Sequence, residues 1–435
     1  MWPRDAFPRP HSCRKQAPVE DSRWKPINTS FRLTPRSGQA LCSVYASPHS
    51  FGARWRTEQP RHSAAAIRHS PAPSVDPWMT GSRRVYRGEV APVRHKDTGR
   101  LAGQIAGEVV MPGHHEYDVA RRVWNGMIDR RPTVIARCTS AADVAAALEF
   151  ASDAGLRVAV RGGSHNIAGN ATCDDGLVVD LSPMQSVEVD IEARRARTGG
   201  GVTWGVFDEA TQRHGLATTG GLIPTTGIAG FTLGGGLGHL MRSCGLACDN
   251  LLSAEVVTAD GTTLRTDQQQ HPDLFWALRG GGGNFGVVTE FEFRLHQVGP
   301  VLLGGRIAHP LSAARQALQF YRDFCADAPD SVIVYAGLAT GLDGQPRLGW
   351  RAVVNGPAED VESLLALLRT FGMPLLDDIR PQPYVDIQRI IEPLFPPGRL
   401  NYWKAKLRRR TKRRAHRRPH RRDDASAVAV YTHRH

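Results

Sequence analysis

A six-residue loop, Arg-Gly-Gly-Ser-His-Asn at positions 161–166, constrains the fold of this chain more than any other feature. It follows the mostly apolar run 156–160, which predicts a strand, so the loop lies where a strand ends. Glycine lets the backbone approach a ligand closely, and successive main-chain N–H groups in such a turn can hold a phosphate. Arg161 adds a fixed positive charge, and His165 adds an imidazole that a plain phosphate site does not need. The loop therefore predicts an anion-binding turn that contains a nucleophile.

Two more glycine-rich stretches follow, at residues 220–238 and 280–286. The first holds too many glycines to form a stable helix or a regular strand throughout. This composition favours a backbone that lies against a flat ligand over simple flexibility. A single glycine-rich run would be weak evidence, but three motifs in this order between residues 161 and 289 form a specific pattern.

These motifs resemble a known family, the FAD-linked oxidases with a PCMH-type FAD-binding domain. The resemblance rests on the loop at 161–166, on Asp-Gly-Leu-Val-Val-Asp-Leu at 175–181 and on Asn-Phe-Gly-Val-Val-Thr at 284–289. It is closest to the branch that contains the berberine bridge enzymes and bacterial 6-hydroxy-nicotine oxidase. One departure is Ser164, because the family's loop usually reads Gly-Gly-His. The resemblance implies an α+β fold in which a two-subdomain FAD-binding domain precedes a substrate domain built on an antiparallel sheet.

The resemblance also implies a cofactor and its contacts. FAD is expected, joined through its 8α-methyl group to His165, and by this one covalent bond because Ile223 stands where bicovalent members have cysteine. Tyr402 and Lys404, in a segment that matches a family landmark near the active site, are the expected catalytic or substrate-orienting residues. Packing or solvated surface is the alternative for both. The residues expected to contact FAD are Arg161, Gly162, Gly163, Ser164, His165, Asn166, Gly169, Thr226, Gly227, Gly230, Gly234, Gly235, Gly236, Gly238, Gly286 and Val288.

The implied reaction is a flavin-dependent oxidation of a small organic substrate. A base removes an O–H or N–H proton while a hydride passes from the adjacent carbon to flavin N5, and dioxygen then reoxidises the flavin. The sequence leaves open the substrate, the choice between oxidase and dehydrogenase, the catalytic base and the oligomeric state.

Composition divides the chain into four parts. Residues 1–100 are expected to be a disordered basic extension, because they show no sustained helix or strand period. The resemblance implies that residues 101–298 form the FAD-binding domain and residues 299–407 a partial substrate domain. Residues 408–435 read as a basic disordered tail, and the abrupt change after Leu407 suggests a disrupted gene and an incomplete substrate domain.

The charge distribution leaves rival functions open. Each end, 1–100 and 404–435, carries a net +11, so with a total of +13 residues 101–403 carry −9. Eleven Lys and Arg between Lys406 and Arg422 could bind phosphate backbones non-specifically, but no nucleic-acid fold accompanies them, so no specific nucleic-acid partner is expected. A basic-tailed nucleic-acid-binding protein and an inactive flavin-binding remnant are the alternatives to an enzyme.

Cysteine usage and hydropathy add further expectations. Seven scattered cysteines, an odd number, argue against a disulfide framework. Cys244 and Cys248 lack a second pair at ligand spacing, so no metal site is expected. No apolar run of about 18 residues is present, and the first residues lack the apolar core of a secretory signal. A cytoplasmic protein without a membrane partner is therefore expected.

Local patterns predict individual elements. Ser140, with Asp143 three residues later, is typical of a helix N-terminus. Helices are expected at 117–130, 140–150, 203–214, 313–326 and 358–371. Strands are expected at 132–137, 178–181, 187–197, 331–338 and 348–354, with 187–197 continuing the sheet of the strands before it.

Overall fold

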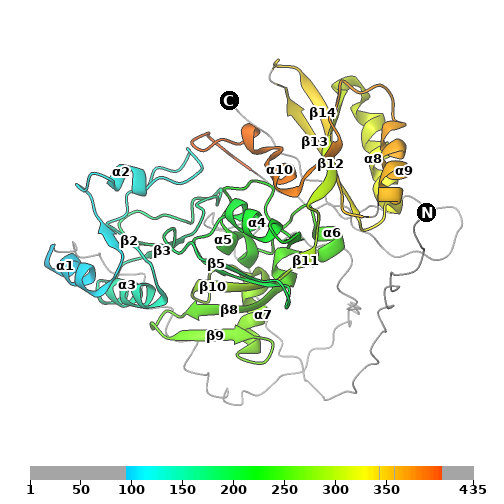
Figure 1. The fold of residues 1–435 in the computed structure, drawn as a ribbon. Helices are drawn as coiled ribbons and strands as arrows, with labels where there is room; N and C mark the ends of the chain where they lie inside the picture. The colour runs from blue at the N-terminus through cyan, green and yellow to red at the C-terminus, as the bar shows by residue number, and fades with distance from the viewer. Residues whose placement is uncertain (1–94, 342, 357, 404–435) are drawn as a thin grey trace, which may run out of the picture. The chain divides into compact units, whose positions relative to one another are not determined.

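The computed structural model describes residues 95–341, 343–356 and 358–403. The expectations for residues 1–94 and 404–435, including Lys404 and the basic tail, lie outside the described residues. Within the described part, the chain forms two α+β subdomains followed by an antiparallel sheet with its own helices (Figure 1).

The first subdomain is a four-stranded mixed sheet in the order β1-β2-β4-β3. β2 and β3 both run parallel to β4, and β1 pairs antiparallel with β2. Parallel neighbours require crossover connections, and α3 provides the one between β2 and β3. The strands are β1 Glu108–Val110, β2 Val134–Arg137, β3 Val158–Arg161 and β4 Leu177–Asp180, and the helices are α1 His95–Gln104, α2 Tyr117–Ala120 and α3 Ala141–Asp153.

The second subdomain is a five-stranded antiparallel sheet in the order β5-β6-β10-β8-β9. A two-stranded ladder of β7 and β11 accompanies it. The strands are β5 Val187–Asp190, β6 Arg195–Gly199, β7 Leu216–Ala217, β8 Leu251–Val257, β9 Thr263–Asp267, β10 Val287–Arg294 and β11 His296–Gln297. The helices are α4 Trp204–Gln212, α5 Ile228–Leu233, α6 Met241–Cys244 and α7 Pro272–Gly281, with the 3-10 turn η3 Ala247–Asn250.

The third part is an antiparallel sheet in the order β13-β14-β12-β15, with β16 also paired to β12. Helices α8 and α9 lie along the sheet in Figure 1, and α10 lies between it and the second subdomain, where it contacts α4. The strands are β12 Val301–Pro310, β13 Val332–Thr340, β14 Pro346–Val354, β15 Leu376–Asp377 and β16 Arg380–Pro383. The helices are α8 Ala314–Asp327, α9 Ala358–Arg369 and α10 Tyr384–Arg389, with the 3-10 turns η4 Leu311–Ala313 and η5 Glu392–Leu394.

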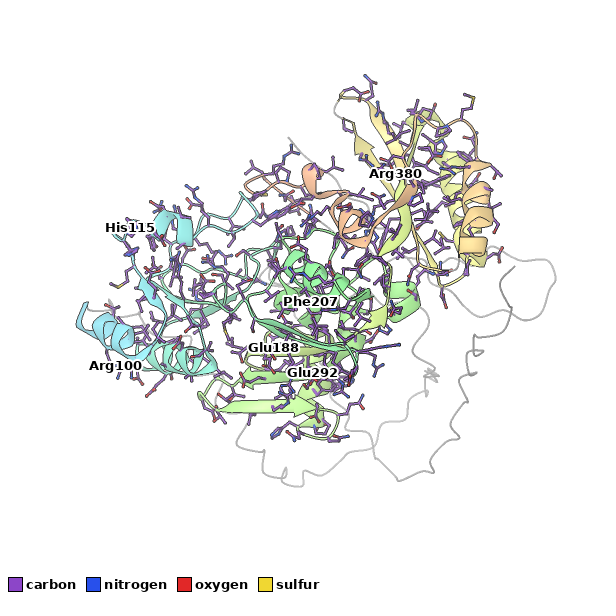
Figure 2. All side chains as sticks on the ribbon, in the orientation of Figure 1. Arg100, His115, Glu188, Phe207, Glu292 and Arg380 are labelled. Atoms are coloured by element: carbon purple, nitrogen blue, oxygen red, sulfur yellow. The ribbon has the colours of Figure 1, made fainter. Side chains whose placement is uncertain are left out.

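Each part has its own apolar core, as burial of one sheet face requires. In the second subdomain the core is aromatic: Trp204 packs edge-on against Phe207, and Phe207 edge-on against Phe293. Figure 2 labels Phe207, which is fully buried, and Glu292, whose carboxylate accepts a hydrogen bond from Ser253 at 2.7 Å. Trp350 is the largest side chain in the core of the third part.

Several sequence predictions are confirmed. The helix expected at 140–150 is α3, and the side chain of Ser140 accepts a hydrogen bond from the backbone N–H of Asp143 at its N-terminus. The substrate-domain helices and strands also lie where they were expected, on an antiparallel sheet.

Other predictions are wrong in informative ways. The helix expected at 117–130 ends at Ala120, because the following residues turn to meet distant parts of the chain. Residues 187–197 do not continue the first sheet, since β5 and β6 form a hairpin at the edge of the second sheet. Helix α1 covers His95–Gln104, and Leu101 within it is fully buried.

Candidate functional site

The loop that follows β3 lies directly on the backbone of a second glycine-rich segment. A Cβ atom built on Gly163 would lie 2.2 Å from the nitrogen and 2.5 Å from the Cα of Gly227. A Cβ atom on Gly227 would lie 2.2 Å from the nitrogen of Gly163. Because any side chain at either position would collide with backbone, only glycine allows the two segments to touch in this way.

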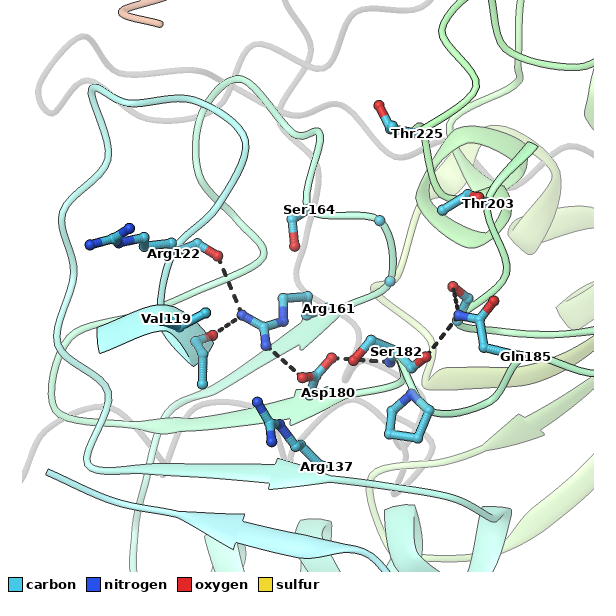
Figure 3. A pocket seen from close by; sticks show the side chains of 15 residues that line it. Val119, Arg122, Arg137, Arg161, Ser164, Asp180, Ser182, Gln185, Thr203 and Thr225 are labelled. Atoms are coloured by element: carbon cyan, nitrogen blue, oxygen red, sulfur yellow. Dashed lines mark hydrogen bonds and ion pairs between the residues drawn. The ribbon is translucent and has the colours of Figure 1, made fainter. Parts of the chain in front are cut away.

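A cavity of about 540 Å³ lies beside this contact (Figure 3). Part of its wall is the loop itself. The wall also includes the turn after β4, residues that precede α4 and α5, the end of α2 with Arg122, and Arg137 at the end of β2. Hydroxyl and amide groups of Ser164, Ser182, Gln185, Thr203 and Thr225 line it. The cavity therefore offers neutral hydrogen-bonding groups and glycine backbone, and its lining also includes the charged residues Arg122, Arg137, Arg161 and Asp180.

Arg161 does not present a free positive charge to this cavity, and that expectation is wrong. Its guanidinium is buried and donates to the carboxylate of Asp180 at 2.5 Å, with further bonds to the carbonyl oxygens of Ala120 and Arg122 (Figure 3). Arg161 and Asp180 are direct neighbours across β3 and β4. The arginine borders the cavity, but it ties the loop to the sheet and to the end of α2.

His165 is held on two sides. Its Nε2 atom lies 2.8 Å from the hydroxyl oxygen of Thr225, and its ring stacks on Trp124 with centroids 4.8 Å apart and planes 22° apart. Burial lowers the pKa of His165 to about 4. The imidazole is therefore neutral at physiological pH, the form in which a ring nitrogen has a lone pair to donate.

Residues 398–403, at the end of the described chain, complete the surroundings of His165 and Trp124. The side-chain amide of Asn125 donates to the carbonyl oxygen of Asn401 at 2.9 Å, and its oxygen accepts from the Asn401 N–H at 2.9 Å. A Cβ atom on Gly126 would lie 2.1 Å from the carbonyl oxygen of Gly398, so the backbones touch here as well. Trp403 then packs edge-on against Trp124, with ring centroids 6.1 Å apart.

The expected FAD-contacting residues other than Arg161 and His165 fall into two groups. The first group borders open space or the cavity. Gly162, Gly163 and Ser164 line the cavity, and Thr226 and Gly227 follow its lining residue Thr225 in the chain. Asn166 and Gly234 are exposed, and Gly230 and Gly235 have no neighbour within 4 Å of an added Cβ. The second group lies against other parts of the chain: Gly169 against Ile128, Gly236 against Phe231, Gly238 against the Gly220 carbonyl, Gly286 against the Val257 carbonyl and Val288 behind Gly200. The glycines of the second group allow the loops to pack closely against the rest of the chain, whereas most of the first group lie at the surface or beside the cavity.

The third glycine-rich stretch joins the second. The N–H of Gly282 donates to the carbonyl oxygen of Leu233 at 2.9 Å, so residues 280–283 lie beside the end of α5.

Tyr402 is 57% exposed, and its chain neighbours Asn401 and Trp403 make the contacts to Asn125 and Trp124 described above. Tyr402 therefore lies on a segment that contacts Trp124, the residue that stacks on His165.

The sheet of the third part meets the glycine-rich segment at Gly238. The hydroxyl of Tyr335 donates to the Gly238 carbonyl at 2.9 Å, and the guanidinium of Arg351 lies 4.8 Å from the Tyr335 ring centroid. His239 packs edge-on against Tyr335, and burial keeps the pKa of His239 well below its usual value. Sequence reasoning did not identify Tyr335 or Arg351, because only the tertiary fold places β13 and β14 there.

Three findings bear on the other expectations, each for the residues that the structure describes. No group of three or more His, Cys, Asp or Glu side chains is arranged to hold a metal ion. The described cysteines, Cys138, Cys173, Cys244, Cys248 and Cys325, are free thiols. No helix in 95–403, outside the gaps at 342 and 357, is long and apolar enough to cross a membrane.

Comparison with known proteins places this site in a family. Residues 132–267 match the family model described as an FAD binding domain. The (R)-6-hydroxynicotine oxidase of Paenarthrobacter nicotinovorans is 37% identical over 305 residues, which are 69% of this chain and 66% of that protein. An FAD-linked oxidoreductase of Dictyostelium discoideum is 33% identical over 305 residues, covering 69% of this chain and 65% of its own length.

A solved structure supports the same assignment. The crystal structure of 6-hydroxy-D-nicotine oxidase from Arthrobacter nicotinovorans superimposes with a TM-score of 0.65 and 36% identity, covering 68% of this chain and 66% of that one. The fold and the sequence are thus those of FAD-binding oxidoreductases. Within that class, the chain belongs to the FAD-linked oxidases with a PCMH-type FAD-binding domain, the family of the berberine bridge enzyme-like proteins. The chain spans just under two thirds of the length of these curated relatives.

Proposed function

We propose that this chain is an FAD-dependent oxidoreductase that oxidises an alcohol or amine carbon of a small organic molecule. When bound, FAD would accept a hydride from that carbon at its N5 atom and pass the electrons to dioxygen. The observation that carries the proposal is the backbone contact between Gly163 and Gly227, which builds one continuous surface from two glycine-rich loops beside the ring of His165.

The surface fits a large, flat, anionic cofactor. Gly230 and Gly235 have no atom within 4 Å of an added Cβ, so a side chain there would occupy the space that such a ligand needs. Ser164, Thr203 and Thr225 add hydroxyl donors at the cavity wall. In this proposal these groups, and not the guanidinium of Arg161, hold the cofactor's polar atoms, because that guanidinium is already paired with Asp180.

His165 has the properties that covalent attachment requires. The low pKa keeps its imidazole neutral, and Thr225 engages Nε2. Among the described residues nothing hydrogen-bonds to Nδ1, which is therefore the nitrogen left to bond with the 8α-carbon of FAD. Ile223, at the position where a second attachment would arise, carries no nucleophile, which supports a single covalent bond.

The substrate would approach from the side of β13 and β14. Tyr335 and Arg351 lie where this sheet meets Gly238, and Tyr402 lies on the segment next to His165. These side chains can orient a polar substrate, and Tyr402 and Lys404 remain our proposed catalytic or substrate-orienting residues. A small-molecule partner and electron transfer to dioxygen belong to this proposal.

The test is reduction of the bound flavin under anaerobic conditions. Purified protein is mixed with (R)-6-hydroxynicotine, the compound in the name of a bacterial relative, and then with sugars, aromatic alcohols and other alkaloids. Loss of the long-wavelength flavin absorbance with one of these compounds, and its return on admitting air, would support an oxidase. Flavin that dithionite bleaches but that none of these compounds bleaches would instead identify a protein that only binds the cofactor.

A further inference from the structure

The stacking of Trp124 on His165 is a feature that neither the sequence motifs nor the family model singles out. Trp124 lies 38 residues before Gly162, the first glycine of the loop, yet its indole is buried and covers one face of the imidazole. Its backbone N–H also donates to the carbonyl oxygen of Ser164 at 3.2 Å, the residue directly before His165. Trp124 is therefore held to the loop both by its backbone hydrogen bond and by the stacking of its ring.

Thr225 provides the second constraint on the imidazole. A stacked ring fixes the plane of the imidazole, while the 2.8 Å contact from Nε2 to the Thr225 hydroxyl fixes its rotation within that plane. Together the two contacts leave Nδ1 pointing in one direction. Holding a reacting atom in a single orientation can supply a large part of a rate enhancement.

Trp124 is in turn held by the segment 398–403. The Gly398 N–H donates to the Trp124 carbonyl oxygen at 2.9 Å, and Trp403 packs against the indole edge. Asn125, the next residue, is 1% exposed and exchanges two hydrogen bonds with Asn401, which is 2% exposed. These buried amide bonds form a latch, because breaking them would leave polar groups unsatisfied away from water.

We propose that Trp124 is a positioning residue for covalent attachment of FAD and that the Asn125–Asn401 latch acts through it. This inference rests on the proposed linkage at His165. Attachment forms a bond between a nitrogen of His165 and the 8α-carbon of FAD, and it breaks one C–H bond of the methyl group and the imidazole N–H bond. The two electrons released pass through the flavin ring to dioxygen, which takes up the two protons and leaves as hydrogen peroxide.

The experiment follows the rate of attachment. Apoprotein is incubated with FAD in air, samples are denatured in acid at intervals, and flavin fluorescence on the polypeptide is compared with total bound flavin before denaturation. Trp124→Leu removes the flat face, Trp124→Phe keeps one, and Asn125→Ala removes the side chain that makes both latch hydrogen bonds to the Asn401 backbone. The matched control is Trp350→Leu, which removes another buried tryptophan from the core of the third part.

We expect attachment to slow by at least about tenfold in Trp124→Leu and in Asn125→Ala. Trp124→Phe should recover most of the rate, and Trp350→Leu should match the wild type. Attachment at the wild-type rate in Trp124→Leu would overturn this inference while leaving the linkage intact. No attached flavin in the wild type would instead overturn the proposed linkage itself. If Trp124→Leu is insoluble, Trp124→Met, which has a similar volume on a flexible unbranched chain and no flat face, takes its place with the same expected outcomes.

Discussion

Asp180→Ala is expected to lower the free energy of unfolding by about 3–5 kcal/mol, the usual cost of removing one partner from a buried ion pair. Asp180 is fully buried, and its carboxylate is the anionic partner of the Arg161 guanidinium. Without it, a buried cation would retain only the carbonyl oxygens of Ala120 and Arg122. Urea denaturation followed by circular dichroism measures the change.

A matched control separates burial from charge. Glu209→Ala breaks the pair with Arg389 on the surface, and such exposed pairs contribute within about 1 kcal/mol. The double variant Arg161→Met/Asp180→Ala should be more stable than Asp180→Ala alone, because it removes the unpaired charge. If Asp180→Ala cost no more than Glu209→Ala, the pair would not anchor the loop as described.

The stability of the protein is expected to fall as pH rises from about 4 to about 7 because of Asp208. This carboxyl group is buried between α4 and α10, and burial raises its pKa to about 7 against an ordinary value of 3.8. Gln388 donates a hydrogen bond to it at 3.0 Å, and the neighbouring charges of Glu209 and Arg389 act in opposite directions. The buried hydroxyl of Tyr384 also lies near it.

The sign follows from proton binding. Below about pH 4 the carboxyl group is protonated in both the folded and the unfolded chain, so it contributes no pH dependence. Between about pH 4 and pH 7 the unfolded chain ionises while the folded protein keeps its proton, so each rise in pH favours unfolding. The loss levels off above about pH 7 and amounts to an effect on the order of 4 kcal/mol.

Asp208→Asn isolates this contribution, because an amide does not titrate and keeps nearly the same shape. We expect the free energy of unfolding of the variant to lack the decline that the wild type shows between about pH 4 and pH 7. The two proteins are compared by urea denaturation at several pH values, with Asp118→Asn as an exposed control. Parallel curves for wild type and Asp208→Asn would contradict the account.

Local sequence signals predicted the elements that depend on near neighbours. Ser140 begins α3 because its side chain bonds to a backbone group three residues away, an interaction that the sequence itself displays. The composition of the two glycine-rich segments predicted that their backbone lies close to a ligand, but it did not predict that Gly163 and Gly227 lie against each other. The helices and strands of the substrate domain could also be predicted, since alternation and helical periodicity are properties of short segments.

Signals that depend on distant partners were missed. The chain leaves its helix after Ala120 because Asn125 pairs with Asn401, a residue 276 positions later, and nothing in the local pattern announces this pairing. The role of Arg161 was misjudged for the same reason. Its partner Asp180 becomes adjacent only when β3 and β4 pair in parallel, which turns a charge expected at the ligand into a structural one.

The central claim is that this chain holds FAD through His165, and one measurement tests it most directly. Purified wild type and His165→Ala are denatured in acid, and flavin fluorescence that remains on the polypeptide is recorded for each. The account predicts attached flavin in the wild type and none in His165→Ala. Attached flavin in both proteins would contradict the assignment of His165, and soluble wild-type protein without any flavin would contradict the claim itself.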